Sequence, residues 1–459
     1  MPVNSTHPDY DLRISDWRKC RDAFEGEAAI KAAGTAYLPR ASGLSTEEYN
    51  AYKERALFYS ITNKSVSALA GMATAKPAAL SYPKELESYF KDASGMQFHE
   101  LFTKSVSETL LMGRIGILVD RDGSGEPYFA IYTAESIINW AHDDTGKLVQ
   151  VTLSEQYLET DANDKFKRTK KLRHRVLEIV NGVYTQTVYN AGESLASTGI
   201  TPKNYGKPMN FIPFTVINPF GLGFEDSKPP MLDIVSVNIS HYRSSADLEH
   251  GRHFTALPTP VVSGVDGSTT LKIGALSAWV LPDPNARAYY LEFTGVGLGS
   301  LEKAITEKQS QLASLSARLL DNSKRGSEAA DTVRLRYASE TASLSTVVLA
   351  VEAGLTEIFT NICVLLDIKP EISIVLNKEF LDGRLSGAEV QKFVQSYLDG
   401  GMSKETLVYI LRRGDVIPVN RTDEEELASL VQAEEARQQS AMAAASGTNQ
   451  SSDNSGVTK

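Results

Sequence analysis

The chain has 459 residues, of which 42% are hydrophobic and 23% are charged. This composition is typical of a folded globular protein, not a disordered or fibrous one, and the length suits about two to four domains. The formal net charge of −10 argues against a protein that coats nucleic acid, because such proteins present a dominant basic face.

The cysteine content and the N-terminal residues indicate where in the cell the chain is made. Two cysteines, Cys20 and Cys363, are too few for a disulfide framework or a thiolate zinc site, and they fit synthesis in a reducing cytoplasm. The polar first ten residues lack the apolar stretch of a signal peptide. Because no uncharged apolar run reaches roughly 18 residues, we expect no membrane-spanning segment.

The N-terminal part of the chain, residues 11–90, has the pattern of an α-helical layer. Trp17 and Cys20 lie on one apolar stripe, and Ser45 with Glu48 has the form of a capping box that opens a further helix. We therefore expect several short helices before the first strand.

A mixed α+β region follows, in which apolar segments of strand type are separated by Asp, Asn and Gly loops. The expected strands are 115–119, 128–132, 148–153, 172–180, 183–189 and 211–217. A basic run between two of them contains Lys167, Arg168, Lys170 and Lys171. This run is either a basic patch for DNA or an acidic partner, or the solvated tip of a hairpin.

Two amphipathic helices are predicted at residues 230–255 and 299–320, on either side of a Pro-punctuated extended region. Their apolar side chains recur at alternating steps of three and four residues, the spacing of helices that pack along their length. The positions of this seam are Leu232, Val235, Ile239, Tyr242, Leu301, Ile305, Leu312, Leu315 and Leu319. The region between the two helices, 256–298, is predicted to form a small β module.

The second helix leads into a short polar loop, residues 321–331, and then into a long helix within 332–379. The loop contains Asn322, Ser323, Lys324, Arg325 and Gly326. Apolar residues at helical spacing predict the long helix. Short capped helices are expected in 380–436, and the Gln-, Ser- and Ala-rich segment 437–459 is expected to be disordered.

Two features have the outline of a ligand site. Gly295, Gly297 and Gly299 precede a helix, but their G-x-G-x-G spacing differs from the dinucleotide fingerprint, so a flexible hinge is favoured over a nucleotide site. His250 and His253 share a helix face near His241 and Asp247, and exposed histidines at a helix end are commoner than a metal site. We expect no catalytic activity, no metal and no cofactor.

Several short segments are characteristic of one protein family. They are His7-Pro8-Asp9-Tyr10, Cys20-Arg21-Asp22, Tyr37-Leu38-Pro39-Arg40, Tyr52-Lys53-Glu54-Arg55-Ala56, Leu110-Leu111-Met112-Gly113-Arg114 and Glu340-Thr341-Ala342. Over roughly residues 10–435, the sequence resembles the portal proteins of tailed bacteriophages, in the podovirus- and siphovirus-like branch. These segments are family patterns and not catalytic signatures.

The resemblance implies a mainly helical α+β fold, assembled as a closed ring of usually twelve subunits. Its parts are named wing, stem, clip and crown. Carried onto this chain, they are the wing 1–229, first stem helix 230–255, clip 256–298, second stem helix 299–320, tunnel loop 321–331, long helix with wing return 332–379, crown 380–436 and tail 437–459.

The resemblance also implies a function. The ring would lie at one capsid vertex of the virion, after synthesis in the host cytoplasm, and would conduct double-stranded DNA during packaging and ejection. Residues 322–326 would be the loop at the DNA channel. Implied partners are the terminase large subunit, head–tail adaptor and tail proteins, and major capsid and scaffolding proteins, with no membrane. The competing hypotheses are a nucleotide-binding enzyme that uses Gly295–Gly299, and a scaffold protein that forms no ring.

Overall fold

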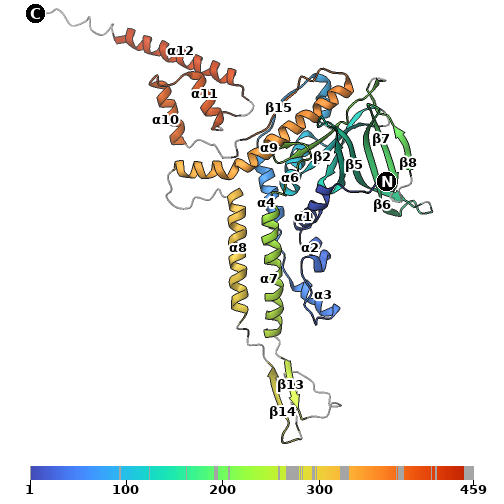
Figure 1. Ribbon diagram of the computed structural model, residues 1–459. Helices are drawn as coiled ribbons and strands as arrows, with labels where there is room; N and C mark the ends of the chain where they lie inside the picture. Colours follow the sequence, from blue (N-terminus) through green and yellow to red (C-terminus); the bar gives the residue numbers. More distant parts are fainter. Residues whose placement is uncertain are drawn as a thin grey trace, which may run out of the picture. The chain divides into compact units, whose positions relative to one another are not determined.

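The structure is a computed structural model, and its chain divides into two units, Met1–Lys378 and Glu379–Lys459, which are described separately (Figure 1). The described residues are 2–91, 95–122, 125–161, 163–190, 195–204, 207–256, 259–264, 279, 281, 283–291, 295, 297–320, 330–378, 380, 387–414, 416–418 and 421–448.

The first unit begins with a layer of helices, as the sequence predicts. They are α1 (Pro8–Glu25), α2 (Glu27–Ala33), α3 (Thr46–Arg55), α4 (Ile61–Thr74), α5 (Glu87–Lys91) and α6 (Phe98–Met112), with short 3-10 turns at Gly34–Ala36 and Lys84–Leu86. The capping box of Ser45 and Glu48 is present at the start of α3. Helix α6 ends at Gly113, whose φ of 72° lies in the left-handed region that favours glycine.

A four-stranded antiparallel sheet follows α6, with the strand order β12-β11-β2-β3. Its strands are β2 (Ile115–Arg121), β3 (Pro127–Thr133), β11 (Phe214–Asn218) and β12 (Gly221–Leu222). Strand β11 is buried along its whole length. At Gly116 of β2, a Cβ would lie 2.4 Å from Cζ of Phe214, so only glycine fits there without repacking.

A second antiparallel sheet has the order β4-β5-β6-β7-β8. Its strands are β4 (Ile137–His142), β5 (Leu148–Thr160), β6 (Arg168–Val180), β7 (Val183–Asn190) and β8 (Leu195–Ile200), and a short hairpin of β9 (Lys203–Asn204) and β10 (Lys207–Pro208) follows. The turn Ala134–Ser136 links β3 to β4.

Strands β5 and β6 are longer than the sequence predicts, and their far ends pair only with each other. Strand β4 pairs with β5 up to Leu153, and β7 pairs with β6 from Arg173 onward. The pairs from Gln156–Leu172 to Thr160–Arg168 therefore have no further described strand on either side. We call residues 156–172 the β5–β6 arm.

Helix α9 (Ala330–Leu366) crosses the first unit and packs on β11, β12, β2 and α6 (Figure 1). Gly354 makes the close approach possible, because a Cβ there would lie 2.4 Å from Cδ1 of Ile217. After α9, strand β15 (Ser373–Val375) pairs with the distant β1 (Ala79–Ser81). These two strands close the unit with segments almost 300 residues apart.

The sequence gives no reason to expect a membrane-spanning helix, but one part of α9 has the necessary length and apolar composition. This part is Ala342–Leu366, and 61% of the window is buried inside the protein. Its buried side chains include Val351, Leu355, Ile358 and Phe359. Because this face is covered by the sheet and by α6, we interpret it as the central core helix of the unit.

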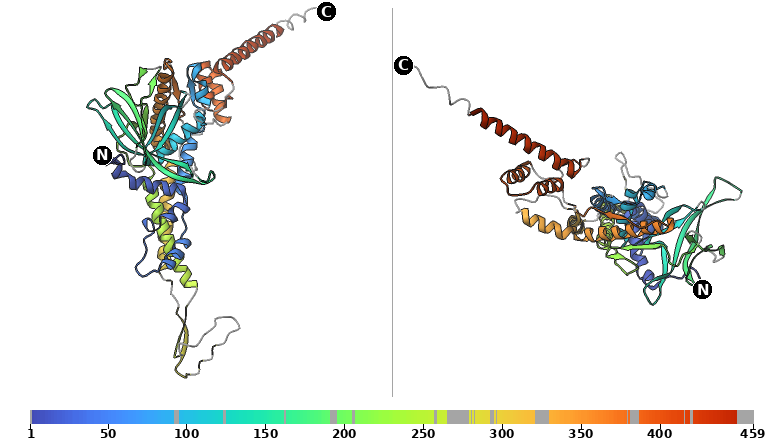
Figure 2. Two further views of the ribbon diagram at one scale, coloured as in Figure 1. Left: turned by 90° about the vertical axis from the view of Figure 1, so that its right-hand side faces the viewer. Right: turned by 90° about the horizontal axis from the view of Figure 1, so that it is seen from above.

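Helices α7 (Leu232–Ala256) and α8 (Leu298–Leu320) lie side by side (Figure 1), and they also run along each other in the left view of Figure 2. Between them, β13 (Thr259–Ser263) and β14 (Arg287–Leu291) form an antiparallel hairpin. Residues 265–278, within the predicted β module, lie outside the described residues.

The second unit contains three helices, α10 (Gly387–Leu398), α11 (Lys404–Arg413) and α12 (Asp423–Thr448). Its small core is built on Leu407, Val408, Leu411 and Ile417. The segment expected to be disordered from residue 437 onward is therefore helical as far as Thr448. Alanine is abundant in this segment and has the highest helix propensity of all residues.

Candidate functional site

The first part of α7 is anchored in the helical layer of the first unit. Asn238 Nδ2 donates to the Tyr59 carbonyl at 2.9 Å, and Tyr52 Oη donates to Asp247 at 2.6 Å. The Tyr242 ring lies edge-on to Phe58, with the ring centroids 5.9 Å apart. These contacts fix the direction in which α7 leaves the unit.

Helices α7 and α8 run antiparallel, held by polar contacts and one close approach. Arg252 of α7 forms an ion pair with Glu302 of α8 at 2.9 Å. Closer to the start of α7, Lys308 Nζ donates to Ser244 Oγ. At the far end of the pair, a Cβ on Gly251 would lie 2.5 Å from Cδ2 of Leu298.

The predicted seam residues differ in burial between the two helices. In α7, Leu232, Val235, Ile239 and Tyr242 are all buried. In α8, Leu312 is buried, whereas Leu301, Ile305 and Leu315 are only half-buried, and the side chain of Leu319 lies outside the described part. The apolar stripe of α8 is thus incompletely covered by its own chain.

The hairpin between the two helices presents apolar side chains to solvent. All residues of β14 are exposed, including Tyr289, Tyr290 and Leu291. A two-stranded hairpin alone is marginally stable in water. The described residues thus leave an apolar surface of this hairpin uncovered.

The predicted DNA-channel residues, Asn322 to Gly326, fall in 321–329, which lies outside the described residues. The basic run is described. Lys167, Arg168, Lys170 and Lys171 all lie exposed on the β5–β6 arm. Lys167 pairs with Asp161 at 3.4 Å, and Lys171 pairs with Glu159.

The structure gives no support to a nucleotide site at Gly295–Gly299 or to a metal site at His250 and His253. Strand β14 before the glycines is antiparallel to β13, so the loop does not belong to a parallel βαβ unit. The Gly295 carbonyl accepts from the Leu298 amide at 2.9 Å in a tight turn into α8. Among the described residues, no group of three or more His, Cys, Asp and Glu side chains could hold a metal ion.

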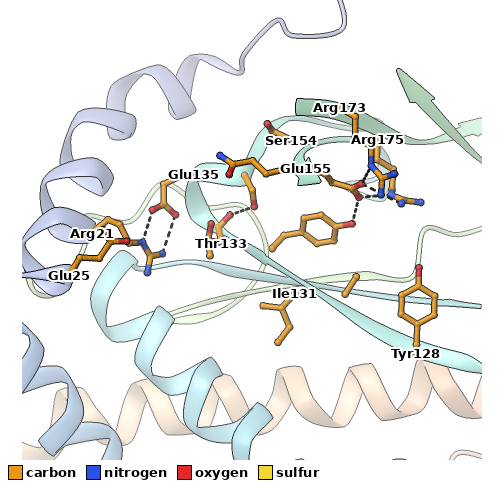
Figure 3. A pocket seen from close by; sticks show the side chains of 14 residues that line it. Arg21, Glu25, Tyr128, Ile131, Thr133, Glu135, Ser154, Glu155, Arg173 and Arg175 are labelled. Carbon is orange, nitrogen blue, oxygen red and sulfur yellow. Dashed lines mark hydrogen bonds and ion pairs between the residues drawn. The ribbon is translucent and has the colours of Figure 1, made fainter. Parts of the chain in front are cut away.

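An open polar pocket of about 780 Å³ lies between α1, β3 and the base of the β5–β6 arm (Figure 3). At one end, Arg21 forms ion pairs with Glu108 at 2.7 Å and Glu135 at 2.9 Å. At the other end, Glu155 accepts hydrogen bonds at 2.6 Å from Arg173 Nε and Arg175 Nε (Figure 3). Apart from Glu25, the charged side chains that line the pocket therefore already have partners.

The electrostatics of Glu155 identify it as a structural anchor. Burial opposes its ionisation, but hydrogen bonds from Arg175, Tyr132 and Arg173 hold the pKa of its carboxyl below the ordinary value. Burial and the bond to Glu155 raise the pKa of the Tyr132 hydroxyl. A carboxylate that stays ionised and a phenol that stays protonated are poorly suited to proton transfer near neutral pH.

Sequence reasoning missed this network, because its members come from three strands and carboxylates are unpatterned along the chain. One signal was present. Arg173 and Arg175 alternate with residue 174, so they lie on one face of a strand. Only the register, which pairs Glu155 with Arg173, places the acid beside them.

The family model that matches this chain is described as a domain of unknown function (DUF4055), and it covers residues 230–363. The match begins just before α7 and ends inside α9, so it spans both paired helices and the hairpin between them. It covers less than half of the chain. No curated protein matches the sequence.

Two of the solved structures that are similar to the chain are necks of GTA particles. One is described as the neck of an empty GTA particle, computed with C6 symmetry, with 13% identity and a TM-score of 0.40. The other is the neck of a native GTA particle, computed with C12 symmetry, with 14% identity and a TM-score of 0.38. Each comparison covers 76% of this chain and 89% of the other. Similarity at this level transfers neither activity nor partners.

Proposed function

We propose that this protein is the portal, or head-to-tail connector, subunit of a tailed bacteriophage or phage-like particle. Copies of it form a closed ring of about twelve subunits at one capsid vertex, through which double-stranded DNA is packaged and ejected. The proposal rests on the sequence resemblance together with one structural observation. Helix α7, an exposed β-hairpin, helix α8 and the core helix α9 follow one another in the order of stem, clip, stem and wing helix.

The incomplete cover of α8 supports assembly. Leu301, Ile305 and Leu315 are half-buried in a single chain. Apolar side chains in a row on a long helix are stabilised when a neighbour covers them. In a ring, the α7–α8 pair of the next subunit supplies that cover.

The remaining roles follow from charge and exposure. A channel for DNA conducts best when few cations grip the phosphates, and the acidic net charge of −10 suits this. The β13–β14 hairpin, with Tyr289 and Tyr290 exposed, is the proposed platform for the terminase and later for adaptor or tail proteins. We propose no catalytic activity and no cofactor for the chain.

The first experiment measures mass and symmetry of the purified protein by native mass spectrometry and negative-stain electron microscopy. A closed ring with a hole wide enough for duplex DNA is expected. A monodisperse monomer or dimer, at every salt concentration and also after addition of capsid components, would contradict the proposal.

A double substitution tests the surface that carries the proposal. Leu301→Asp with Ile305→Asp places charges on the half-buried stripe of α8 and should abolish rings, because unpaired charges at a buried contact cost several kcal/mol. Gln311→Asp, at an exposed position of the same helix, is the matched control. Circular dichroism of the monomer shows whether the double variant still folds, and folded variants with wild-type ring yield would argue against the stem assignment.

A second test concerns the loop 321–331. Lys324→Glu with Arg325→Glu should leave rings intact but lower DNA packaging, because it replaces two cations beside the channel with repulsive charges. Packaging efficiency is measured as nuclease-protected DNA per particle. Unchanged packaging would remove the loop–DNA contact from the proposal without affecting the ring.

A further inference from the structure

The two faces of the β5–β6 arm differ in whether their charged side chains form ion pairs. On one face, Lys171 pairs with Glu159, and Arg173 pairs with Glu155 at 2.6 Å at the base of the arm. The Arg173 guanidinium also lies 5.3 Å from the ring centroid of Tyr157. The charges on this face are neutralised within the arm itself.

The opposite face carries unpaired cations beside apolar side chains. The register places Leu158 opposite Lys170, and Leu172 diagonally beside Leu158. Leu158 is 56% exposed. Within the described part of the chain, neither Lys170 nor Arg168 forms an ion pair. Phe166 at the tip of the arm is 84% exposed.

This pattern predicts the chemistry of a partner. About five residue pairs beyond the sheet give the arm a reach of roughly 15 Å, and a lone two-stranded arm is only marginally stable. Phosphates would satisfy the two cations, but they would gain nothing from the adjacent leucines. The face fits a protein surface that combines an apolar groove with carboxylates.

Such a groove is present on the same chain, formed by other elements. It has a volume of about 660 Å³, runs along α9, and is lined by Leu222, Leu349, Ala353 and Ile374 together with the carboxylates Glu352 and Glu357. No residue of the β5–β6 arm lines it.

The carboxylates in and beside the groove differ in whether they already form an ion pair. Glu352 is neutralised by Lys378 at 2.9 Å. Glu357 has no ion pair among the described residues; burial raises the pKa of its carboxyl, and a hydrogen bond with Thr215 partly offsets this. The exposed Glu371, next to the groove residue Ile372, has no ion pair among the described residues either. Phe220 lies two residues from Leu222 and is 76% exposed. Two carboxylates without a described ion pair, together with the apolar side chains beside them, thus complement the leucines of the arm and its two cations, which also form no described ion pair.

We infer that the β5–β6 arm of one subunit docks into the α9 groove of the next subunit in the ring. This inference rests on the proposed function. Because the arm and the groove are different surfaces of one chain, the contact is heterologous and repeats around a closed ring. Leu158 and Leu172 would lie in the groove, while Arg168 and Lys170 would face Glu357 and Glu371.

Chemical cross-linking tests the contact directly. Leu158→Cys and Leu349→Cys are combined in one chain and treated with a short bismaleimide; the native Cys20 and Cys363 are buried. A ladder of covalent multimers on a denaturing gel is expected, and each single variant should give monomer only. Intact rings from the double variant that yield no ladder overturn the docking inference and leave the ring proposal standing. If wild type forms no ring, both fall.

Charge exchange supplies an independent readout. Arg168→Glu with Lys170→Glu should lower the ring fraction at least about tenfold, the effect of losing roughly one charge pair. Glu357→Lys with Glu371→Lys should do the same, and the four changes together should restore rings. Lys171→Glu, on the opposite face of the arm, is the control and should leave rings unchanged. Arm variants that form normal rings but fail only at capsid incorporation would show a different partner and overturn the inference.

Discussion

At the scale of single residues, Glu155 is the side chain on which most polar contacts of the pocket converge. It accepts from two arginines and from Tyr132 Oη, each at 2.6 Å, and its side chain is largely buried. A carboxylate bonded in this way fixes the relative position of β3, β5 and β6. Its removal takes the ion-pair partner from Arg173 and leaves Arg175 with Gln186 and the more distant Asp120.

Glu155→Gln should therefore destabilise the first unit by about 2–3 kcal/mol, since a partly buried charge network loses its negative charge and one of its two acceptor oxygens. Urea unfolding followed by tryptophan fluorescence measures this, because Trp17 and Trp140 are both buried in that unit. Glu159→Gln is the control. It breaks the exposed pair with Lys171 and should cost less than about 0.5 kcal/mol.

The same residue gives a pH dependence of known sign. The folded-state pKa of Glu155 is depressed, so its contribution is present above the unfolded pKa, near the ordinary value of 4.5, and is lost as the pH falls through the folded pKa. The stability difference between wild type and Glu155→Gln should be constant near pH 7 and shrink below about pH 4.5. A difference that grows on acidification would contradict this assignment.

At the scale of elements, the approach of α9 to the first sheet depends on a residue without a side chain. A Cβ on Gly354 would lie 2.4 Å from both Cδ1 and Cγ1 of Ile217. Because β11 is buried on its whole length, the helix has to move away from the strand to accept a larger residue.

Gly354→Val should therefore cost about 2–3 kcal/mol through overpacking. Gly71→Ala is the matched control, since Gly71 lies in helix α4 with open space around it. Alanine there should stabilise the protein by about 0.5–1 kcal/mol. Thermal unfolding of the two variants and wild type distinguishes packing at α9 from a general effect of removing glycine.

The sequence predicts which elements exist better than it predicts what covers them. The stripe of α7 is apolar where predicted, but Tyr242 packs edge-on against Phe58, which lies outside α8. A periodic stripe identifies the buried face of a helix and says nothing of the surface that buries it. Strands β5 and β6 are longer than predicted because polar residues dominate both faces of the β5–β6 arm, which obscures the alternation that marks a strand.

The predicted site residues were accessible to sequence analysis to different degrees. Spacing alone located the α7 seam, and all four of its residues are buried. It also selected the basic run, which lies exposed on the arm. Spacing could not reveal the Glu155 network or the α9 groove, because both combine segments far apart in the chain, which only tertiary structure brings together.

At the scale of the whole molecule, the division after Lys378 predicts how the protein responds to truncation. The first unit includes β15 and the ion pair between Lys378 and Glu352, whereas the core of the second unit is built from its own helices. The second unit is therefore dispensable for the stability of the first.

A chain that ends at Lys378 should keep the melting temperature of the first unit within about 2 °C, because it keeps the β1–β15 pair and the ion pair between Lys378 and Glu352. A chain that ends at Ile368 should melt several degrees lower, since β1 loses its only described partner strand and Glu352 loses Lys378. Differential scanning calorimetry of the three chains checks this. Equal losses in both truncations would contradict the division into two units.

The pairing of β1 with β15 has a consequence for the nascent chain. Residues 79–81 leave the ribosome long before residues 373–375, and at about 5–20 residues per second the delay is roughly 15–60 s. During this interval β2, β11 and α6 lack the core helix α9 that covers them. Until α9 is synthesised, the apolar surface that it later covers is exposed to chaperones and to other nascent chains. The yield of correctly folded subunit therefore depends on the rate of translation up to α9.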